Sequence, residues 1–132
     1  MDNIDKTEKI TINIGVVDLG HIDLLVEQGF YSNRTDFIKT SVRNQISTHQ
    51  QYIQHEISSK VLAAGVVHYN QSDLVELYNK NQSLEIRLIG MLILDPDVTP
   101  EAIYKTVKVA KIFGVIKASP QVKAALEAIK KK

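Results

Sequence analysis

A single short strand followed by two helices is the feature that most limits how this chain can fold. In the segment Lys9 to Ile14 every second residue is an isoleucine and the residues between are polar. This period-two pattern predicts a strand with one apolar face. No second strand lies nearby in the sequence, and a lone strand is unstable in water. The sequence therefore predicts that the strand pairs with the same strand of a second copy, in an obligate homodimer.

The polar face of this predicted strand is suited to reading DNA. An antiparallel ribbon of two such strands fits the major groove. If the isoleucines pack onto the helices, Lys9, Thr11 and Asn13 project from the ribbon, where their side chains can bond to base edges. Taken alone, the pattern also fits an amphipathic strand whose polar face is only solvated.

The first predicted helix follows the strand directly. Gly15 is its expected N-cap, apolar residues recur at helical spacing, and Gly29 marks its end. Gly20 lies inside this helix, where glycine costs roughly 1 kcal/mol relative to alanine. Either the helix starts after Gly20 or its packing needs a small residue there.

The start of the second predicted helix is a candidate phosphate site. The helix begins at Arg34, with Asn33 as its N-cap and Asp36 three residues further on, close to the capping-box pattern. The free backbone N–H groups and the positive dipole end attract phosphate, and Arg34 adds a full charge. Such contacts set register rather than sequence preference. The alternative for Arg34 is an ordinary charged residue in a first turn.

Residues 9 to 46 resemble the ribbon-helix-helix DNA-binding proteins, the superfamily of the MetJ, Arc and CopG repressors. The most specific stretch is Gly29 to Lys39, which runs glycine, aromatic residues, N-cap, basic residue, hydroxyl, acid, two apolar residues and a basic one. The resemblance implies that Lys9, Thr11 and Asn13 contact bases. It also implies DNA-backbone contacts from the turn, through Ser32, Asn33, Arg34 and Thr35.

Charge and composition set limits on this interpretation. Residues 1 to 59 hold five Lys or Arg against eight Asp or Glu, and the whole chain has a net charge of +1. Attraction to DNA would thus depend on where the cations lie and on their doubling in a dimer. Cysteine is absent, the apolar runs are too short to cross a bilayer, and the start of the chain is unlike a signal peptide. We therefore expect a cytoplasmic protein with no membrane association.

The second half of the chain contains a repeat. The second helix is expected to continue as a helical linker over residues 48–60. Beyond it, the segment Arg87 to Leu92 resembles the segment Lys111 to Ile116, 24 residues later. A third, less similar copy of the repeat begins at Gly65. Each unit reads as strand, turn and helix, which predicts a small, mainly parallel sheet. The short period also suits a solenoid.

The sequence offers no sign of an enzyme, a metal site or a cofactor site. It has no phosphate-cradling glycine loop, no recognisable pair of catalytic carboxylates and no nucleophile motif. Nickel-responsive relatives of the ribbon-helix-helix family bind metal through histidines and a cysteine. This chain has no cysteine, and only His68 follows residue 55, so that site cannot be built. His49 and His55 are six residues apart and are expected to be solvated.

The sequence thus predicts an α+β protein in three parts. Residues 1–47 form a ribbon-helix-helix dimerisation and DNA-binding domain, residues 48–60 a helical linker, and residues 61–132 a small α/β domain for oligomerisation or sensing. The expected function is a sequence-specific transcriptional regulator, a repressor that binds double-stranded DNA as a homodimer or a tetramer. The alternatives are an antitoxin that represses its own operon and a self-assembling scaffold protein that does not bind DNA.

Overall fold

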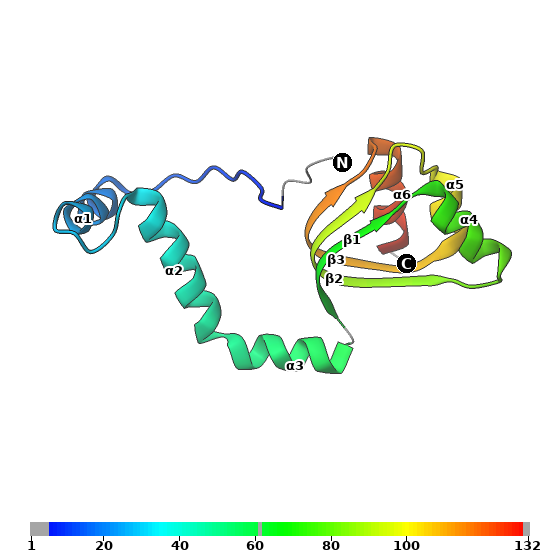
Figure 1. Cartoon of the computed structure of the whole chain (residues 1–132), viewed down its shortest axis with the longest axis horizontal. Helices are drawn as coiled ribbons and strands as arrows, with labels where there is room; N and C mark the ends of the chain where they lie inside the picture. Colours follow the sequence, from blue (N-terminus) through cyan, green and yellow to red (C-terminus); the bar gives the residue numbers. More distant parts are fainter. Residues whose placement is uncertain (1–5, 61, 131–132) are drawn as a thin grey trace. The chain divides into compact units, whose positions relative to one another are not determined.

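The computed structural model describes residues 6–60 and 62–130, and the chain divides into two compact units (Figure 1). The N-terminal unit is Lys9–Glu56. The C-terminal unit is Ile57–Lys132 together with Met1–Glu8. The division falls inside the segment predicted as a linker. Each unit is described by itself below.

The first helix, α1 (Val16–Glu27), begins and ends where glycines allow it to. Gly15 is the N-cap, as predicted. At the other end Gly29 has a φ of +87°, and its N–H donates to the Val26 carbonyl oxygen at 3.0 Å. The N–H of Phe30 donates to the Leu25 carbonyl oxygen at the same distance. This pair of bonds is a Schellman motif, which satisfies the last carbonyl groups of the helix.

One of the two explanations offered for Gly20 is wrong. The helix starts four residues before Gly20, so it does not start late. A methyl group added at Gly20 would meet no atom within 4 Å in the described chain, so packing inside the single chain does not explain the glycine, and its need in packing stays a prediction.

The second helix is shorter than the sequence predicts. It starts at Arg34 as expected, but α2 (Arg34–Thr48) ends at His49, and a separate helix α3 (Gln50–Lys60) follows. His49 has a φ of −103° and a ψ of 15°, and its N–H bonds to the Ile46 carbonyl oxygen in a tighter turn. The expectation of one continuous helix is therefore wrong at His49.

In the C-terminal unit strands alternate with helices. The strands are β1 (Ala63–Tyr69), β2 (Leu84–Leu94) and β3 (Val107–Lys117), all parallel and in the order β1-β2-β3. The helices that follow them are α4 (Gln71–Asn79), α5 (Pro100–Thr106) and α6 (Pro120–Lys130). They lie inside the curve of the strands (Figure 1). The described chain thus has the parallel strands that the repeat predicts.

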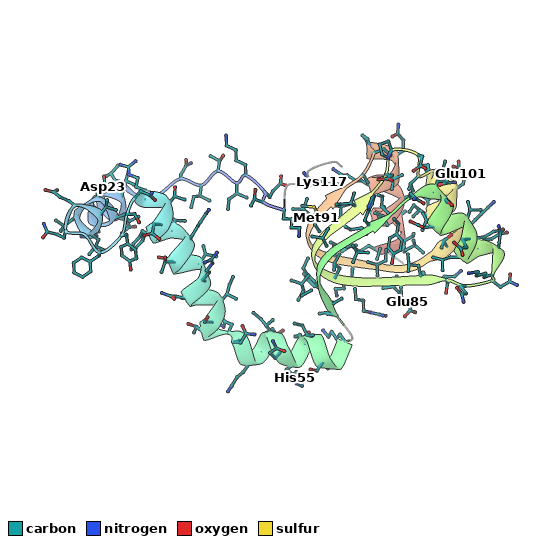
Figure 2. All side chains as sticks on the ribbon, in the orientation of Figure 1. Asp23, His55, Glu85, Met91, Glu101 and Lys117 are labelled. Carbon is teal, nitrogen blue, oxygen red and sulfur yellow. The ribbon has the colours of Figure 1, made fainter. Side chains whose placement is uncertain are left out.

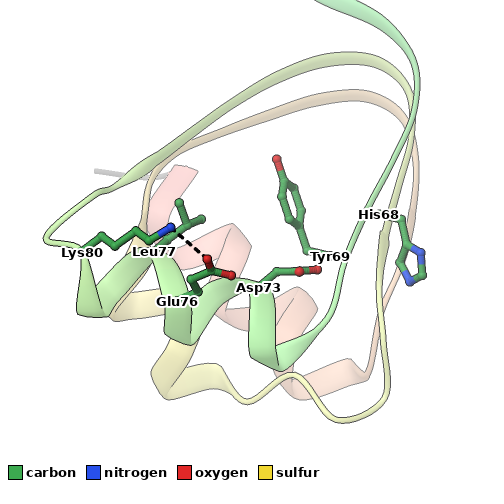
Figure 3. Close-up of a pocket in the computed structure, with 6 residues that line it drawn as sticks. All are labelled: His68, Tyr69, Asp73, Glu76, Leu77 and Lys80. Atoms are coloured by element: carbon green, nitrogen blue, oxygen red, sulfur yellow. Dashed lines mark hydrogen bonds and ion pairs between the residues drawn. The ribbon is translucent and has the colours of Figure 1, made fainter.

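The register of the sheet reproduces the repeat residue by residue. Arg87 pairs with Lys111 and Gly90 with Gly114, the same offset of 24 residues that the sequence shows. Gly65 pairs with Gly90, which places three glycines in one row across the sheet. All three have positive φ, between +134° and +142°. The strands turn sharply around the helices (Figures 1 and 3), and this row supplies the backbone freedom for that bend.

The core of the C-terminal unit lies between the sheet and its helices. Alternate residues of the strands face the helices, as period-two geometry requires. The most deeply buried apolar side chains come from α4, β2, α5 and α6: Leu74, Leu88, Leu92, Ile103 and Val122. Thr106 is also buried, and its hydroxyl lies 3.5 Å from the Leu74 carbonyl oxygen.

Candidate nucleic-acid interface

The segment predicted to read bases is exposed and has no regular secondary structure in the single chain. Lys9, Thr11 and Asn13 are all exposed. So are Ile10 and Ile12, at 78% and 60% of their full accessible surface. A strand needs a neighbour for its backbone hydrogen bonds, and no other segment pairs with this one among the described residues. The strand, which requires a second copy, stays a prediction.

The N-terminal unit leaves most of its apolar side chains in solvent. Among residues 9–56, all of them described, Ile22 is the one buried hydrophobic residue, at 6% exposure. Tyr31 and Phe37 stack edge to face, with ring centroids 4.9 Å apart. The large exposed apolar residues come from the N-terminal segment and the helices: Ile10, Ile12, Val16, Val17, Leu24, Phe30, Val42, Ile46 and Tyr52. So extensive an exposed apolar surface marks an interaction site.

Hydrogen bonds at the start of α2 fix the turn before it. The Asn33 side-chain oxygen accepts from the N–H of Asp36 at 2.7 Å, which confirms the predicted N-cap. The Asp36 carboxylate accepts from the backbone N–H and the hydroxyl of Ser32, at 2.9 and 3.0 Å. These bonds hold the pKa of Asp36 below its ordinary value. The cap therefore differs from a standard capping box, because the acid reaches back to the residue before the N-cap.

Arg34 has a partner that the sequence did not predict. Its Nε and one terminal nitrogen donate to the two carboxylate oxygens of Asp23 on α1, both at 2.8 Å. The hydrogen bond from Arg34 lowers the pKa of Asp23, and the bond to Asp23 raises the pKa of Arg34. Both side chains are about half exposed. Figure 2 labels Asp23 on α1. This forked pair occupies two of the five N–H donors with which Arg34 could bind a phosphate.

Replacing Asp23 with asparagine should strengthen binding to DNA if Arg34 contacts a phosphate. Arg34 would no longer be held by a carboxylate, and one negative charge beside the DNA would be removed. Exposed ion pairs contribute little, so we expect an increase in affinity of at most about five-fold in a titration of labelled duplex. Asp18→Asn, on the same helix, is the matched control for net charge. Equal affinities of the two variants would contradict a role for the pair in DNA binding.

The C-terminal unit has a shallow hollow beside α4, of about 370 Å³. Figure 3 shows six residues that line it: His68, Tyr69, Asp73, Glu76, Leu77 and Lys80. Their charged groups are engaged locally, since Lys80 pairs with Glu76 at 2.9 Å and Asp73 accepts from the N–H of Asn70. We assign no ligand to this hollow.

His68 joins β1 to the loop after β2. Its Nε2 lies 2.6 Å from an oxygen of Asp95, and Figure 3 shows its ring turned away from Tyr69 and Asp73. This contact connects the two segments within the C-terminal unit. Within residues 6–60 and 62–130 no three His, Cys, Asp or Glu side chains come together as metal ligands. No helix in the same ranges is long and apolar enough to cross a membrane.

Comparison with known proteins adds a family match over most of the chain. The sequence model described as the ribbon-helix-helix transcriptional regulator family matches residues 5–123. The match begins before the predicted strand and continues through β3 into α6, so it spans residues of both units. No curated protein and no solved structure matches the chain.

Proposed function

Because the chain belongs to the ribbon-helix-helix transcriptional regulator family, we propose that it is a sequence-specific repressor that binds double-stranded DNA as a homodimer. The observation that carries the proposal is the exposed segment Lys9 to Ile14, whose alternating pattern fits a strand and which has no partner strand among the described residues. A second copy supplies that partner, and the two segments together form the ribbon that enters the major groove.

Pairing of two copies accounts for the exposed apolar surface of the N-terminal unit. A unit that buries only Ile22 has too little core to be stable alone. In the proposed dimer Ile10 and Ile12 pack beneath the ribbon, against exposed apolar residues of the helices such as Val17 and Leu24. Each isoleucine that becomes fully buried contributes about 1.5 to 3 kcal/mol.

In the proposed complex the ribbon reads the sequence. Lys9, Thr11 and Asn13 stand on the face opposite the isoleucines, and all three are exposed in the single chain. Lysine donates to the acceptors of guanine, asparagine bonds to adenine through both of its polar atoms, and threonine bonds to several bases. Two copies place six such side chains in one groove.

The start of α2 is proposed to hold the DNA backbone, with its four residues in different roles. The N–H groups of Arg34 and Thr35 lie in the first turn, where the helix itself offers no acceptor. Asn33 uses its oxygen as a cap, which leaves its amide nitrogen to donate to phosphate. The Ser32 hydroxyl hydrogen is already given to Asp36, so Ser32 must release that bond before it can donate to DNA.

The decisive experiment is selection of bound sequences from a random duplex pool at near-physiological salt. We expect the chain to enrich a short repeated site, and we expect Asn13→Ala to weaken binding to that site by about 1 to 3 kcal/mol for each base that Asn13 contacts. Lys9→Ala should behave similarly, since the ribbon presents both residues to the same groove.

Asn44→Ala is the matched control, because Asn44 is an exposed asparagine of α2 outside both proposed contact regions. It should bind the selected site as tightly as the unmodified chain. Unchanged affinity in the Asn13 and Lys9 variants would refute the assignment of the base contacts. A pool with no enriched sequence would refute sequence-specific binding and favour the self-assembling scaffold.

A further inference from the structure

Positive charge is concentrated in the last quarter of the chain. Residues 100 to 132 hold eight lysines against two glutamates, whereas residues 1 to 99 hold eight Lys or Arg against thirteen Asp or Glu. The net charge of +1 hides this separation. The excess of cations belongs to the C-terminal unit, whereas the segments proposed above to contact DNA belong to the N-terminal unit.

The fold places these lysines on three neighbouring elements at the β3 edge of the sheet, with Lys111 and Lys117 on the strand face opposite the helices. β3 is an outer strand of the sheet, α5 leads directly into it, and α6 packs against it. Their lysines among the described residues are all exposed, and Figure 2 labels Lys117 at the end of β3. We call this set the basic edge: Lys105, Lys108, Lys111, Lys117, Lys123 and Lys130.

Among the described residues the lysines of the basic edge form no close pairs with carboxylates, although Glu101 lies on α5 and Glu127 on α6. In the part of the chain that the structure describes, none of its six lysines forms an ion pair. Lys105 lies 5.3 Å from the ring centre of Tyr78, and Lys111 lies 5.8 Å from that of Phe113. Glu85, which is paired in the sheet with β3, is bonded instead to Arg87 at 3.1 Å.

Protection of the sheet edge explains only part of this pattern. Lysines on an outer strand discourage other strands from adding to it, and Lys108, Lys111 and Lys117 can serve that purpose. Lys105, Lys123 and Lys130 lie on helices, which have no open strand edge to protect. An excess of exposed ammonium groups without ion-pair partners, on a strand and two helices at one sheet edge, is instead typical of a site for a polyanion.

We propose that the basic edge binds the phosphate backbone of duplex DNA without reading its sequence. That the polyanion is DNA rests on the proposed function. Each lysine that meets a phosphate releases condensed counterions, which gives affinity that depends strongly on salt. The basic edge would thus supply the general attraction to DNA that the N-terminal unit, with no excess of cations, lacks.

The test measures how binding of the full chain to a fixed, unselected duplex falls with salt concentration. We compare the unmodified chain with Lys108→Gln combined with Lys117→Gln, which avoids the ring contact of Lys111. The slope of log affinity against log salt should decrease in magnitude by about 0.9 for each phosphate that is no longer neutralised, or about 2 per copy of the chain. Enrichment of a sequence from the random pool should be unchanged.

Two control variants make the comparison specific. Lys60→Gln combined with Lys80→Gln removes the same charge from exposed positions outside the basic edge, and should change the slope much less. Lys108→Arg combined with Lys117→Arg keeps the charge and should keep the slope. Circular dichroism of each variant establishes that the fold is retained.

The outcomes separate this proposal from the proposed function. Equal slopes for the unmodified chain and the basic-edge variant would overturn the proposal, and growth of that variant into larger particles at an unchanged slope would assign the lysines to edge protection. A chain that binds duplex but selects no sequence would overturn the repressor function, while the slope comparison still decides the role of the basic edge.

Discussion

Replacing Gly90 with alanine should destabilise the C-terminal unit by about 3 kcal/mol or more, a large part of the stability of an ordinary domain. Gly90 has a φ of +141°, in a region that side chains with a Cβ rarely adopt. A Cβ there would lie 2.0 Å from the carbonyl oxygen of Gly65 on the neighbouring strand. The oxygen belongs to the backbone of β1, so it can move away only if the pairing of β1 with β2 is disturbed.

Gly65 provides the matched control for this substitution. It has a φ of +142°, but an added methyl group would meet nothing within 4 Å. Gly65→Ala should therefore lose only the stability that the strained positive φ costs, about 1 to 3 kcal/mol. Urea unfolding followed by circular dichroism measures both variants. Equal losses would show that the close approach to Gly65 has no cost of its own, and an unchanged Gly90→Ala variant would contradict the bend at this row.

The sequence predicted the arrangement of the C-terminal unit because residues that correspond in its repeat also pair in the sheet. Residues 24 positions apart lie side by side in neighbouring strands, so the similarity of Arg87 to Leu92 and Lys111 to Ile116 reports the register directly. The bend at the glycine row could not be predicted in the same way. Glycine is compatible with many backbone conformations, and its positive φ depends on the neighbouring strands.

For the N-terminal unit, local signals were reliable and contacts between helices were not. The caps at Gly15, Gly29 and Asn33 depend on residues next to them in the chain, and all three are confirmed. The pair between Asp23 and Arg34 joins residues 11 positions apart across the α1–α2 turn. No spacing rule relates such residues, because their distance depends on the angle between the helices. The residues proposed to contact DNA stay predictions.

Replacing Ile12 with aspartate should prevent dimerisation and abolish specific DNA binding. Ile12 is 60% exposed in the single chain, and the proposed ribbon buries it in both copies at once. Losing about 1.5 kcal/mol of burial in each copy would raise the dimer dissociation constant about 100-fold or more, and burying two carboxylates would add to the loss. Sedimentation velocity at low micromolar concentration should show a dimer for the unmodified chain and a monomer for the variant.

Two further variants show whether the loss is due to the ribbon. Ile12→Val keeps a β-branched apolar residue and should cost only about 0.5 to 1.5 kcal/mol per copy. Val75→Asp places the same carboxylate on an exposed position of α4 in the C-terminal unit and should leave the sedimentation of the dimer unchanged. If Ile12→Asp still sedimented as a dimer, the copies would associate through another surface, and Lys9, Thr11 and Asn13 would lose the paired strand that is proposed to hold them in the groove.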